Sequence, residues 1–490
     1  MEEAKARIVR PLGPWEQFSS ARHHLGVYRC VVVTVRYVIP HGLENTRAAL
    51  VEALASVVGG QPMLQVGIVG QETNQPAFIH LPEIDLRDHF ELRSQKYTTV
   101  EEYEAKLSET HGWLHDQLWP SIESKVPWKV LALQPESNGL FQTPVIDILF
   151  AYHHSLADGT GGKDFHQHLA AALNTQDRGD TLLEPRYILS FPDIAELPEA
   201  QEEAIPFTRS WPFVLKATWN HLAPSLLKPK PPTPWTGRPI DFALPYITRV
   251  YPLHFSPESL QTLIKASRDH SSSLTALLHA MALASLATRL DPKDAESFVS
   301  MTPINLRPWI SPTVKEGLKT KMRSLVTGLD TPFPASVVGA LRSPHADRDE
   351  LIWQAAKETK RLLDQRVSTL PSDDVAGLLH LIPDFSEYFR GLDGKPRAAT
   401  WEVSNIGVLR CADSNGGWEP TRGMFSIGAM VAGAGIALSV ISIEKHGLTV
   451  TLSWQQDIVD EPLVMGIGTP LRDEIRYRAI LALYKSEGKM

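Results

Sequence analysis

Cysteine is scarce in this chain of 490 residues, and no apolar segment opens it. The two cysteines, Cys30 and Cys411, lie in opposite halves, so neither a disulfide framework nor a zinc ribbon is expected. A reduced, cytoplasmic protein is therefore the simpler interpretation. Residues 1–7 carry acidic groups and no apolar core, which is typical of neither a signal peptide nor a transit peptide.

An excess of positive charge is also missing. Lysine and arginine number 48 against 56 aspartates and glutamates, for a net charge of −8. This balance argues against an extended surface for nucleic acid, so no nucleic-acid partner is expected. Hydrophobic residues make up 43% and charged residues 21%, as in ordinary globular proteins. The length suggests about two to four domains.

Charge is absent from one long stretch, residues 424–443, which is long enough to span a bilayer. The stretch contains three glycines and three serines, and no basic cluster flanks it. Residues 436–443 have the composition of a buried strand, and 448–454 alternate with a period of two after a turn at 445–447. We therefore predict a β-hairpin in a protein core, with peripheral contact to a membrane or lipid surface as an open alternative.

Strand and helix patterns alternate on both sides of a proline-rich region. We place an N-terminal domain at 1–190, a crossover at 191–247 and a C-terminal domain at 248–490. The composition of 31–38, 145–152, 249–255 and 298–303 predicts strands. Helices are predicted near 44–57, 100–118, 163–173, 211–222, 274–290, 346–366, 374–389 and 471–485.

The run with the clearest chemistry is 152–162, Tyr-His-His-Ser-Leu-Ala-Asp-Gly-Thr-Gly-Gly. His153 and His154 end an apolar strand, where side chains alternate, so only one imidazole can face a cleft. A neutral imidazole can take a proton from a hydroxyl, thiol or amine near neutral pH. Asp158 either orients that ring or forms an ion pair that fixes the loop. Gly159 and the glycines after it would let the backbone turn tightly before the helix.

Two other chemistries fit this run less well. His166 and His168 follow it, but residues two apart on a helix point about 200° from each other. No Glu or Cys at ligand spacing completes a metal site, so no metal is expected. The sequence also lacks the Gly-x-Ser-x-Gly elbow that an α/β hydrolase would need.

The pattern His153-His154-x-x-x-Asp158-Gly159 resembles the HHxxxDG signature of the chloramphenicol-acetyltransferase-like acyltransferase superfamily. This superfamily includes nonribosomal peptide condensation domains, plant BAHD acyltransferases and fungal alcohol O-acetyltransferases. Further runs resemble the superfamily and occur in the same order as in its members, over almost the whole chain: 11–16, 22–26, 305–308, 403–407 and 447–454. The first two are similar to the fungal branch.

The resemblance implies an α/β fold with mixed sheets, built as two similar domains with a tunnel and the active site between them. Acyl-CoA, in this branch acetyl-CoA, would enter as co-substrate without any bound cofactor, and a small alcohol would enter opposite. His154 matches the catalytic base of the motif, and His153 matches its supporting histidine. Asp158 matches the structural aspartate, for which Arg307 is the first candidate partner and Arg22 the second.

A tetrahedral intermediate also needs a hydrogen-bond donor for its oxyanion, worth about 3–4 kcal/mol. Ser404 and Asn405 are candidates for this oxyanion or substrate contact, and a strand-end turn is the alternative for both. The sequence lacks the DFGWG motif of the plant branch and any carrier-protein serine motif. We therefore expect a stand-alone protein of neither the plant type nor the synthetase type.

Three functions follow from this sequence. The favoured one is an acyl-CoA-dependent O-acyltransferase that acetylates a hydroxyl of a small, apolar alcohol or secondary metabolite. The second is a CoA-independent condensation-like or cyclising enzyme that uses the same tunnel. The third is a non-catalytic binding protein. A monomer is expected in each case.

Overall fold

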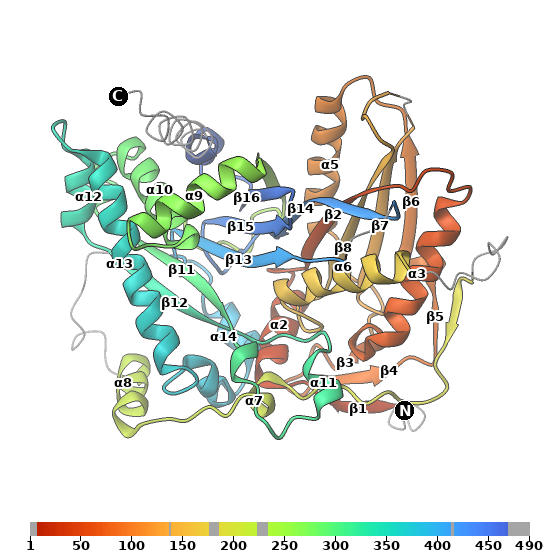
Figure 1. Cartoon of the computed structure of the whole chain (residues 1–490). Coiled ribbons are helices and arrows are strands. Elements are labelled where there is room, and N and C mark those ends of the chain that lie inside the picture. Colours follow the sequence, from red (N-terminus) through yellow and green to blue (C-terminus); the bar gives the residue numbers. More distant parts are fainter. Residues whose placement is uncertain (1–6, 137–138, 176–185, 223–233, 413–415, 469–490) are drawn as a thin grey trace.

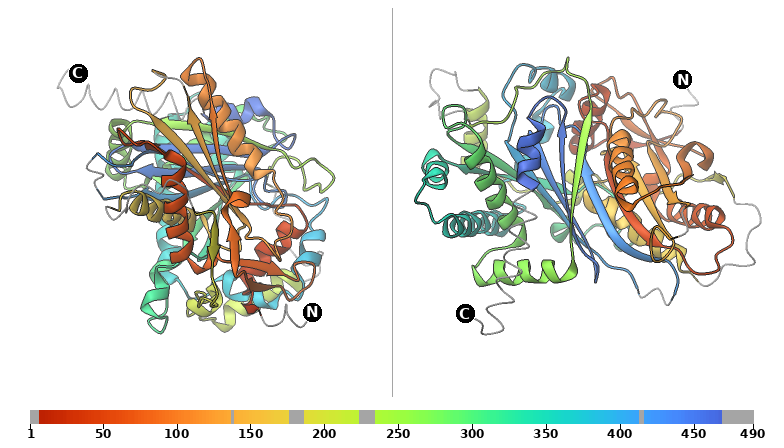
Figure 2. Two further views of the ribbon diagram at one scale, coloured as in Figure 1. Left: turned by 90° about the vertical axis from the view of Figure 1, so that its right-hand side faces the viewer. Right: turned by 90° about the horizontal axis from the view of Figure 1, so that it is seen from above.

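The computed structural model describes residues 7–136, 139–175, 186–222, 234–412 and 416–468. Two large mixed sheets lie side by side, and helices cover each of them (Figure 1). The view from above separates the half that holds the early strands from the half that holds the late ones (Figure 2). The site described below lies where these two halves meet.

The first sheet has the strand order β14–β2–β8–β7–β6. At its centre, β2 and β8 pair antiparallel with Val31 opposite Tyr152. Both are rich in β-branched and aromatic residues, which suit a buried pleated surface, and both have the predicted bounds. The five strands are Val31–Val38 (β2), Phe90–Gln95 (β6), Trp128–Pro135 (β7), Val145–Tyr152 (β8) and Glu419–Ile427 (β14).

The two faces of this sheet pack against different helices because side chains alternate along a strand. Val33 belongs to a core shared with α3 (Thr46–Gly60) and α6 (Gly159–Leu173). Its neighbour Val32 belongs to a separate core with α5 (Val100–His115). Because α6 follows β8 and also contacts β13 of the other sheet, the turn between β8 and α6 lies at the junction of the halves.

The second sheet has the order β10–β16–β15–β13–β11–β12, in which β13 runs parallel to both its neighbours. The predicted hairpin is confirmed, because β15 and β16 pair antiparallel. The strands are Thr248–Phe255 (β10), Phe298–Asn305 (β11), Val326–Phe333 (β12), Trp401–Leu409 (β13), Ile436–Ile443 (β15) and Gly447–Gln455 (β16).

Helices of the second half cover this sheet, and α10 is buried nearly all round, as its apolar sequence predicts. Among the described residues, no single helix has both the length and the apolar composition to cross a membrane; only α9 with α10 passes that test, as a pair bent by 90°. The helices are Pro257–Asp269 (α9), Leu274–Arg289 (α10), Ala335–Arg342 (α12) and Arg348–Thr369 (α13).

Two predicted helices differ from the structure. The segment 374–389 forms two short helices, η4 (Val375–Leu381) and α14 (Phe385–Arg390), because Pro383 cannot continue a helix. The helix after β8 begins at Gly159, four residues before the prediction, because the Asp158 side chain caps it by accepting the Gly161 N–H. The predicted helix 471–485 lies outside the described residues.

Smaller elements complete the two halves. They are Ile8–Pro11 (β1), Pro14–His24 (α2), Pro62–Leu64 (η1), Val66–Val69 (β3), Ala77–His80 (β4), Glu83–Asp85 (β5), Leu86–His89 (α4), Ile188–Ser190 (β9), Gln201–Ala204 (α7), Trp211–Leu222 (α8), Arg307–Trp309 (η3) and Glu316–Lys319 (α11).

The halves are interlocked by the chain itself. Strand β14 comes from the C-terminal part of the sequence, yet it forms the edge of the first sheet beside β2. In the crossover, the Glu202 carboxylate of α7 accepts a 2.8 Å hydrogen bond from the backbone N–H of Trp15. The domain boundaries at 190 and 247 remain predictions.

Candidate active site

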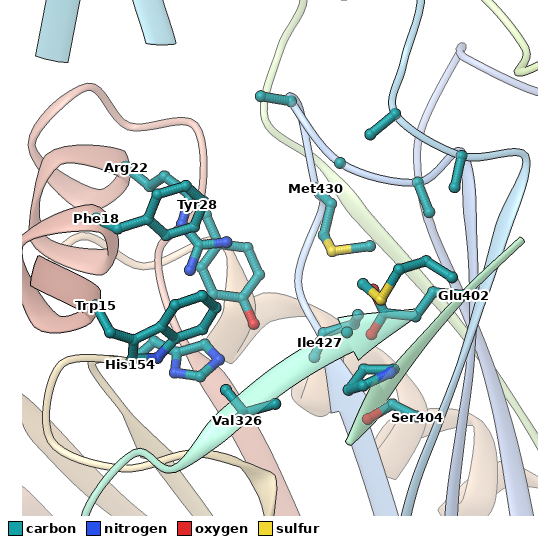
Figure 3. A pocket seen from close by; sticks show the side chains of 18 of the residues that line it. Trp15, Phe18, Arg22, Tyr28, His154, Val326, Glu402, Ser404, Ile427 and Met430 are labelled. Carbon is teal, nitrogen blue, oxygen red and sulfur yellow. The ribbon is translucent and has the colours of Figure 1, made fainter. Parts of the chain in front are cut away.

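A cavity of about 420 Å³ lies between the two large sheets. Its walls come from α2, the turn between β8 and α6, the strands β11 to β14 and the loop before β15. Most lining side chains are apolar or aromatic. Figure 3 shows α2 side chains on one wall and β13 side chains on the other. Of the residues singled out from the sequence, His154, Asp158, Gly159, Arg22 and Ser404 line this cavity.

His154 is the second residue after β8, and its ring packs near Trp15 and Tyr28, with centroid separations of 6.3 and 5.8 Å. Its Nδ1 is buried and makes no hydrogen bond within the described part of the chain. Nε2 is therefore the ring nitrogen left to face the cavity.

Burial, and then the positive charge of Arg22, lower the pKa of His154 to about 4. The imidazole is thus neutral at pH 7 and can accept a proton. The backbone of His154 itself and of Ala157 opposes this shift.

His153 points away from the cavity and is completely buried. Its Nδ1 accepts a 3.0 Å hydrogen bond from the Ser155 N–H, and its Nε2 lies 3.2 Å from the side-chain nitrogen of Gln71. The ring also packs on His23, 4.6 Å between centroids. The opposite facing of the two imidazoles is the arrangement that strand alternation predicts.

Asp158 anchors the turn to the second half of the chain. Arg307 donates two hydrogen bonds to it, from Nη1 to Oδ2 at 2.8 Å and from Nη2 to Oδ1 at 3.1 Å. The backbone N–H groups of Leu325 and Gly161 donate at 2.8 and 2.9 Å. Burial alone would raise the pKa of Asp158, but Arg307 and these donors outweigh it and lower the pKa. The carboxylate is therefore charged and fully bonded, which suits positioning rather than proton transfer.

The segment that carries Leu325 also holds the backbone of His154. The Ser324 hydroxyl, from the second half, donates a 3.0 Å hydrogen bond to the His154 carbonyl oxygen. Arg22, the second candidate partner of Asp158, lies elsewhere on the cavity wall, with its guanidinium 4.5 Å from the Phe18 ring centroid and 4.6 Å from that of Tyr28.

Gly159 allows a close approach of other side chains rather than the tight turn that the sequence suggests. It is the first residue of α6. A Cβ at this position would lie 2.7 Å from Ile406 Cγ2 and 2.9 Å from Phe425 Cζ. The missing side chain therefore lets the helix start pack against β13 and β14.

Ser404 and Asn405 are separated by strand alternation. Ser404 lines the cavity, and its hydroxyl makes no hydrogen bond with the described residues. Asn405 faces away: its amide nitrogen donates to the Thr275 hydroxyl at 3.1 Å, and its oxygen accepts from the Gly407 N–H at 2.9 Å. The structure thus brings Ser404 to the site and leaves Asn405 outside it.

Several lining residues escape sequence reasoning, above all Phe18 and Tyr28 of the N-terminal wall and Glu402 of β13, whereas Trp15 lies within the run 11–16 noted above. Trp15, Phe18 and Arg22 have helical spacing in the sequence, but only the folded chain shows that α2 and the following loop reach this cavity. Glu402 does leave a signal, since it is the one charged residue in the sequence of β13. Within the described ranges, no group of three or more His, Cys, Asp or Glu side chains could hold a metal ion.

Comparison with known proteins places this geometry in a family. Residues 91–475 match the model of the alcohol acetyltransferase family. A probable alcohol acetyltransferase, FCK4 of Fusarium pseudograminearum, is 28% identical over 467 residues, which cover 94% of this chain and 93% of that protein. Another, crmB of Aspergillus fumigatus, is 25% identical over 475 residues, with 92% and 95% covered.

Solved structures match the fold. The TRI3 trichothecene 15-O-acetyltransferase of Fusarium sporotrichioides superposes with a TM-score of 0.69 at 14% identity, covering 96% of this chain and 94% of that one. The first condensation domain of the CDA synthetase gives 0.61 at 14% identity, covering 97% and 96%. The predicted superfamily and the two-part mixed α/β fold are confirmed. The chain belongs to the alcohol acetyltransferase family and is an acyltransferase.

Proposed function

We propose that this enzyme transfers an acetyl group from acetyl-CoA to the hydroxyl of a small, largely apolar alcohol or secondary metabolite, with His154 as the general base. The observation that carries the proposal is a neutral imidazole whose Nε2 faces an apolar cavity between the two halves. Acetyl-CoA acts as a co-substrate, and no bound cofactor takes part.

The reaction then needs two steps. Nε2 of His154 takes the proton of the acceptor hydroxyl while the hydroxyl oxygen attacks the thioester carbonyl carbon, which forms a tetrahedral oxyanion. When this intermediate collapses, the carbon–sulfur bond breaks and the CoA thiolate leaves with the proton from the imidazolium. The products are the acetyl ester and free CoA.

Other residues have supporting roles in this proposal. The Ser404 hydroxyl lines the same cavity and is free to donate to the oxyanion. Asp158, held by Arg307, positions the turn that carries His154. His153 supports the turn from its buried side through the Ser155 N–H.

The direct test is release of the CoA thiol from acetyl-CoA in the presence of a panel of alcohols. We expect acceptor-dependent release by the wild type and a loss of about 10²–10⁴-fold in His154→Ala. His345→Ala, which changes an exposed histidine far along the chain, is the matched control and should behave as wild type.

The outcomes separate the three functions. If CoA binds but no acceptor triggers release, the acceptor panel must be extended to secondary metabolites before the transfer step is rejected. If neither CoA binding nor release is found, acyl transfer is refuted. A His154-dependent reaction without CoA would then indicate a condensation-like or cyclising enzyme, and ligand binding without any reaction would indicate a binding protein.

We further infer that the enzyme works as a cytoplasmic monomer that contacts lipid surfaces through α8. Trp211, Leu215 and Trp219 are 80%, 66% and 57% exposed, and their spacing of four places them on one helix face. Exposed Lys216 adds positive charge beside them. Aromatic rings with nearby basic groups suit the interface of an anionic bilayer.

Co-sedimentation with phosphatidylcholine–phosphatidylserine vesicles tests this contact. The wild type should sediment with the vesicles, and Trp211→Ser/Trp219→Ser should not. Equal co-sedimentation of both proteins with the vesicles would contradict the role of α8. For the free protein, a sedimentation coefficient that corresponds to a dimer would contradict the proposed monomer.

A further inference from the structure

The cavity also holds polar groups that the acetyl-transfer mechanism does not use. Glu402 lies on β13, two residues before Ser404 and on the same face, while the alternate residues Trp401 and Val403 point into the second core. Its side chain is only 4% exposed. Neither carboxyl oxygen makes a hydrogen bond or ion pair with any residue that the structure describes.

The wall opposite carries matching donors. Figure 3 shows Arg22 and Tyr28 on the side of α2, facing Glu402 and Ser404 on the side of β13. Tyr28 is 3% exposed, and its hydroxyl has no hydrogen-bond partner among the described residues. The Arg22 Nε is buried, and within the part of the chain that the structure describes the guanidinium donates a hydrogen bond only to the Ser19 hydroxyl, at 3.2 Å.

The Glu402 carboxyl and the Tyr28 hydroxyl have no hydrogen-bond partner among the described residues, and the Arg22 guanidinium is only partly bonded, so this apolar cavity requires an explanation. A buried polar group normally has a hydrogen-bond partner, and leaving it without one costs stability. Glu402 and Arg22 interact electrostatically but are not joined by an ion pair. The space between them is therefore available to a ligand that bonds to both walls.

We propose that Glu402, Tyr28 and Arg22 form an acceptor subsite for a second hydroxyl, so that the preferred acceptors are diols or related polyhydroxylated molecules rather than simple aliphatic alcohols. This inference rests on the proposed function, because it presumes that the acceptor occupies this cavity with its reacting hydroxyl at His154.

A hydroxyl suits this subsite because it has one donor and two acceptor positions. Its oxygen accepts from Tyr28 or Arg22, and its hydrogen bonds to Glu402. Burial raises the pKa of Glu402 to about 8, and Arg22 opposes this shift. The carboxyl is therefore mostly protonated at pH 7, and a hydroxyl can pair with it in either form, as donor or as acceptor.

The experiment compares α,ω-diols from four to ten carbons with 1-alkanols of the same length, using CoA release as the readout. At the best chain length, the wild type should prefer the diol by at least about tenfold in kcat/KM, since a site built for a hydroxyl rejects the analogue that lacks it. The preference ratio should collapse to within about twofold in Glu402→Leu and persist in Glu402→Gln, which keeps hydrogen-bonding capacity.

Controls separate the subsite from folding and from the transfer reaction. Glu296→Leu changes an exposed glutamate and should keep the wild-type ratio. Tyr28→Phe provides a second variant if Glu402→Leu does not fold, and it should lower the ratio. Calorimetric binding of diol and alkanol to wild type and Glu402→Gln reads the subsite without any turnover.

The results have distinct meanings. The inference is overturned if no chain length favours the diol in kinetics or in binding, or if Glu402→Leu keeps the preference. Equal acetylation of diols and alkanols would refute the subsite and leave the proposed function intact. Diol binding with neither CoA binding nor CoA release would support the subsite and refute the transfer reaction.

Discussion

Replacement of Arg307 by methionine tests whether the clamp on the catalytic turn is real. Arg307 donates two hydrogen bonds to Asp158, whose side chain is nearly buried, and a third at 2.9 Å to the Arg323 carbonyl oxygen. The variant leaves the carboxylate with only the N–H groups of Gly161 and Leu325. Breaking a buried pair costs about 3–5 kcal/mol. Because the Arg307 side chain keeps 19% exposure, we expect the lower end, about 3 kcal/mol.

Urea unfolding measures the loss of unfolding free energy in Arg307→Met. With a slope of about 3 kcal/mol/M, the loss corresponds to a decrease of about 1 M in the urea midpoint. Arg361→Met removes an exposed arginine that pairs with Glu358 on α13, so it should not shift the midpoint. CoA release by Arg307→Met should fall by about 10²-fold, since a base displaced by about 1 Å loses its geometry.

A double-mutant cycle with Asp158→Asn decides between a clamp and two unrelated contacts. If the Arg307–Asp158 pair holds the turn, the double variant loses much less free energy of unfolding than the two single variants lose together. Additive losses, or an Arg307→Met protein with the wild-type urea midpoint and activity, would refute the reasoning.

The pH dependence of this stability follows from the pKa of Asp158, which is lower in the folded protein than in the unfolded chain. Near pH 4 the unfolded chain binds the proton more readily, so acid favours unfolding. The contribution of the pair is therefore complete above about pH 4 and is lost as the pH falls through the folded-state pKa. The urea midpoints of wild type and Asp158→Asn should converge in that acidic window and keep a constant difference between pH 6 and 8.

Further predictions concern the cavity. The pH profile of kcat/KM should be flat near neutrality and fall on acidification through about pH 4, where His154 becomes protonated; an acidic limb near 6.5 would contradict the buried, neutral base. Ser404→Ala should lower kcat by about 10²–10³-fold with little change in KM, and an unchanged kcat would remove it as the oxyanion donor. Gly159→Ala should destabilise the protein by about 1–3 kcal/mol in urea unfolding, because the added Cβ overlaps Ile406 and Phe425; wild-type stability would mean that β13 and β14 yield easily.

Local pattern predicts much of this fold. The bounds of β2 and β8 follow from runs of β-branched and aromatic residues, and the hairpin of β15 and β16 follows from alternation around a turn. Side-chain alternation at the end of β8 predicts that only one imidazole faces the cleft, and the resemblance of the motif assigns that place to His154. These features depend on neighbours in sequence, which is why the sequence alone suffices for them.

Long-range features could not be predicted in the same way. Strand β14 pairs with β2 in the first sheet, although β2 lies nearly four hundred residues earlier. No local pattern in the sequence indicates such a distant partner. The start of α6 was misplaced because capping by Asp158 makes the glycines part of the helix. Tyr28 and Glu402 meet across a cavity formed by both halves, so only the assembled fold reveals them as neighbours.

The most direct test of the central claim is transfer of a labelled acetyl group. Wild type and His154→Ala would be incubated with ¹³C-acetyl-CoA and an alcohol, and the ester and free CoA would be quantified by mass spectrometry. The account predicts labelled ester and CoA in equal amounts from the wild type and neither from the variant. CoA release without ester, or the same ester yield from His154→Ala, would contradict acetyl transfer with His154 as the base.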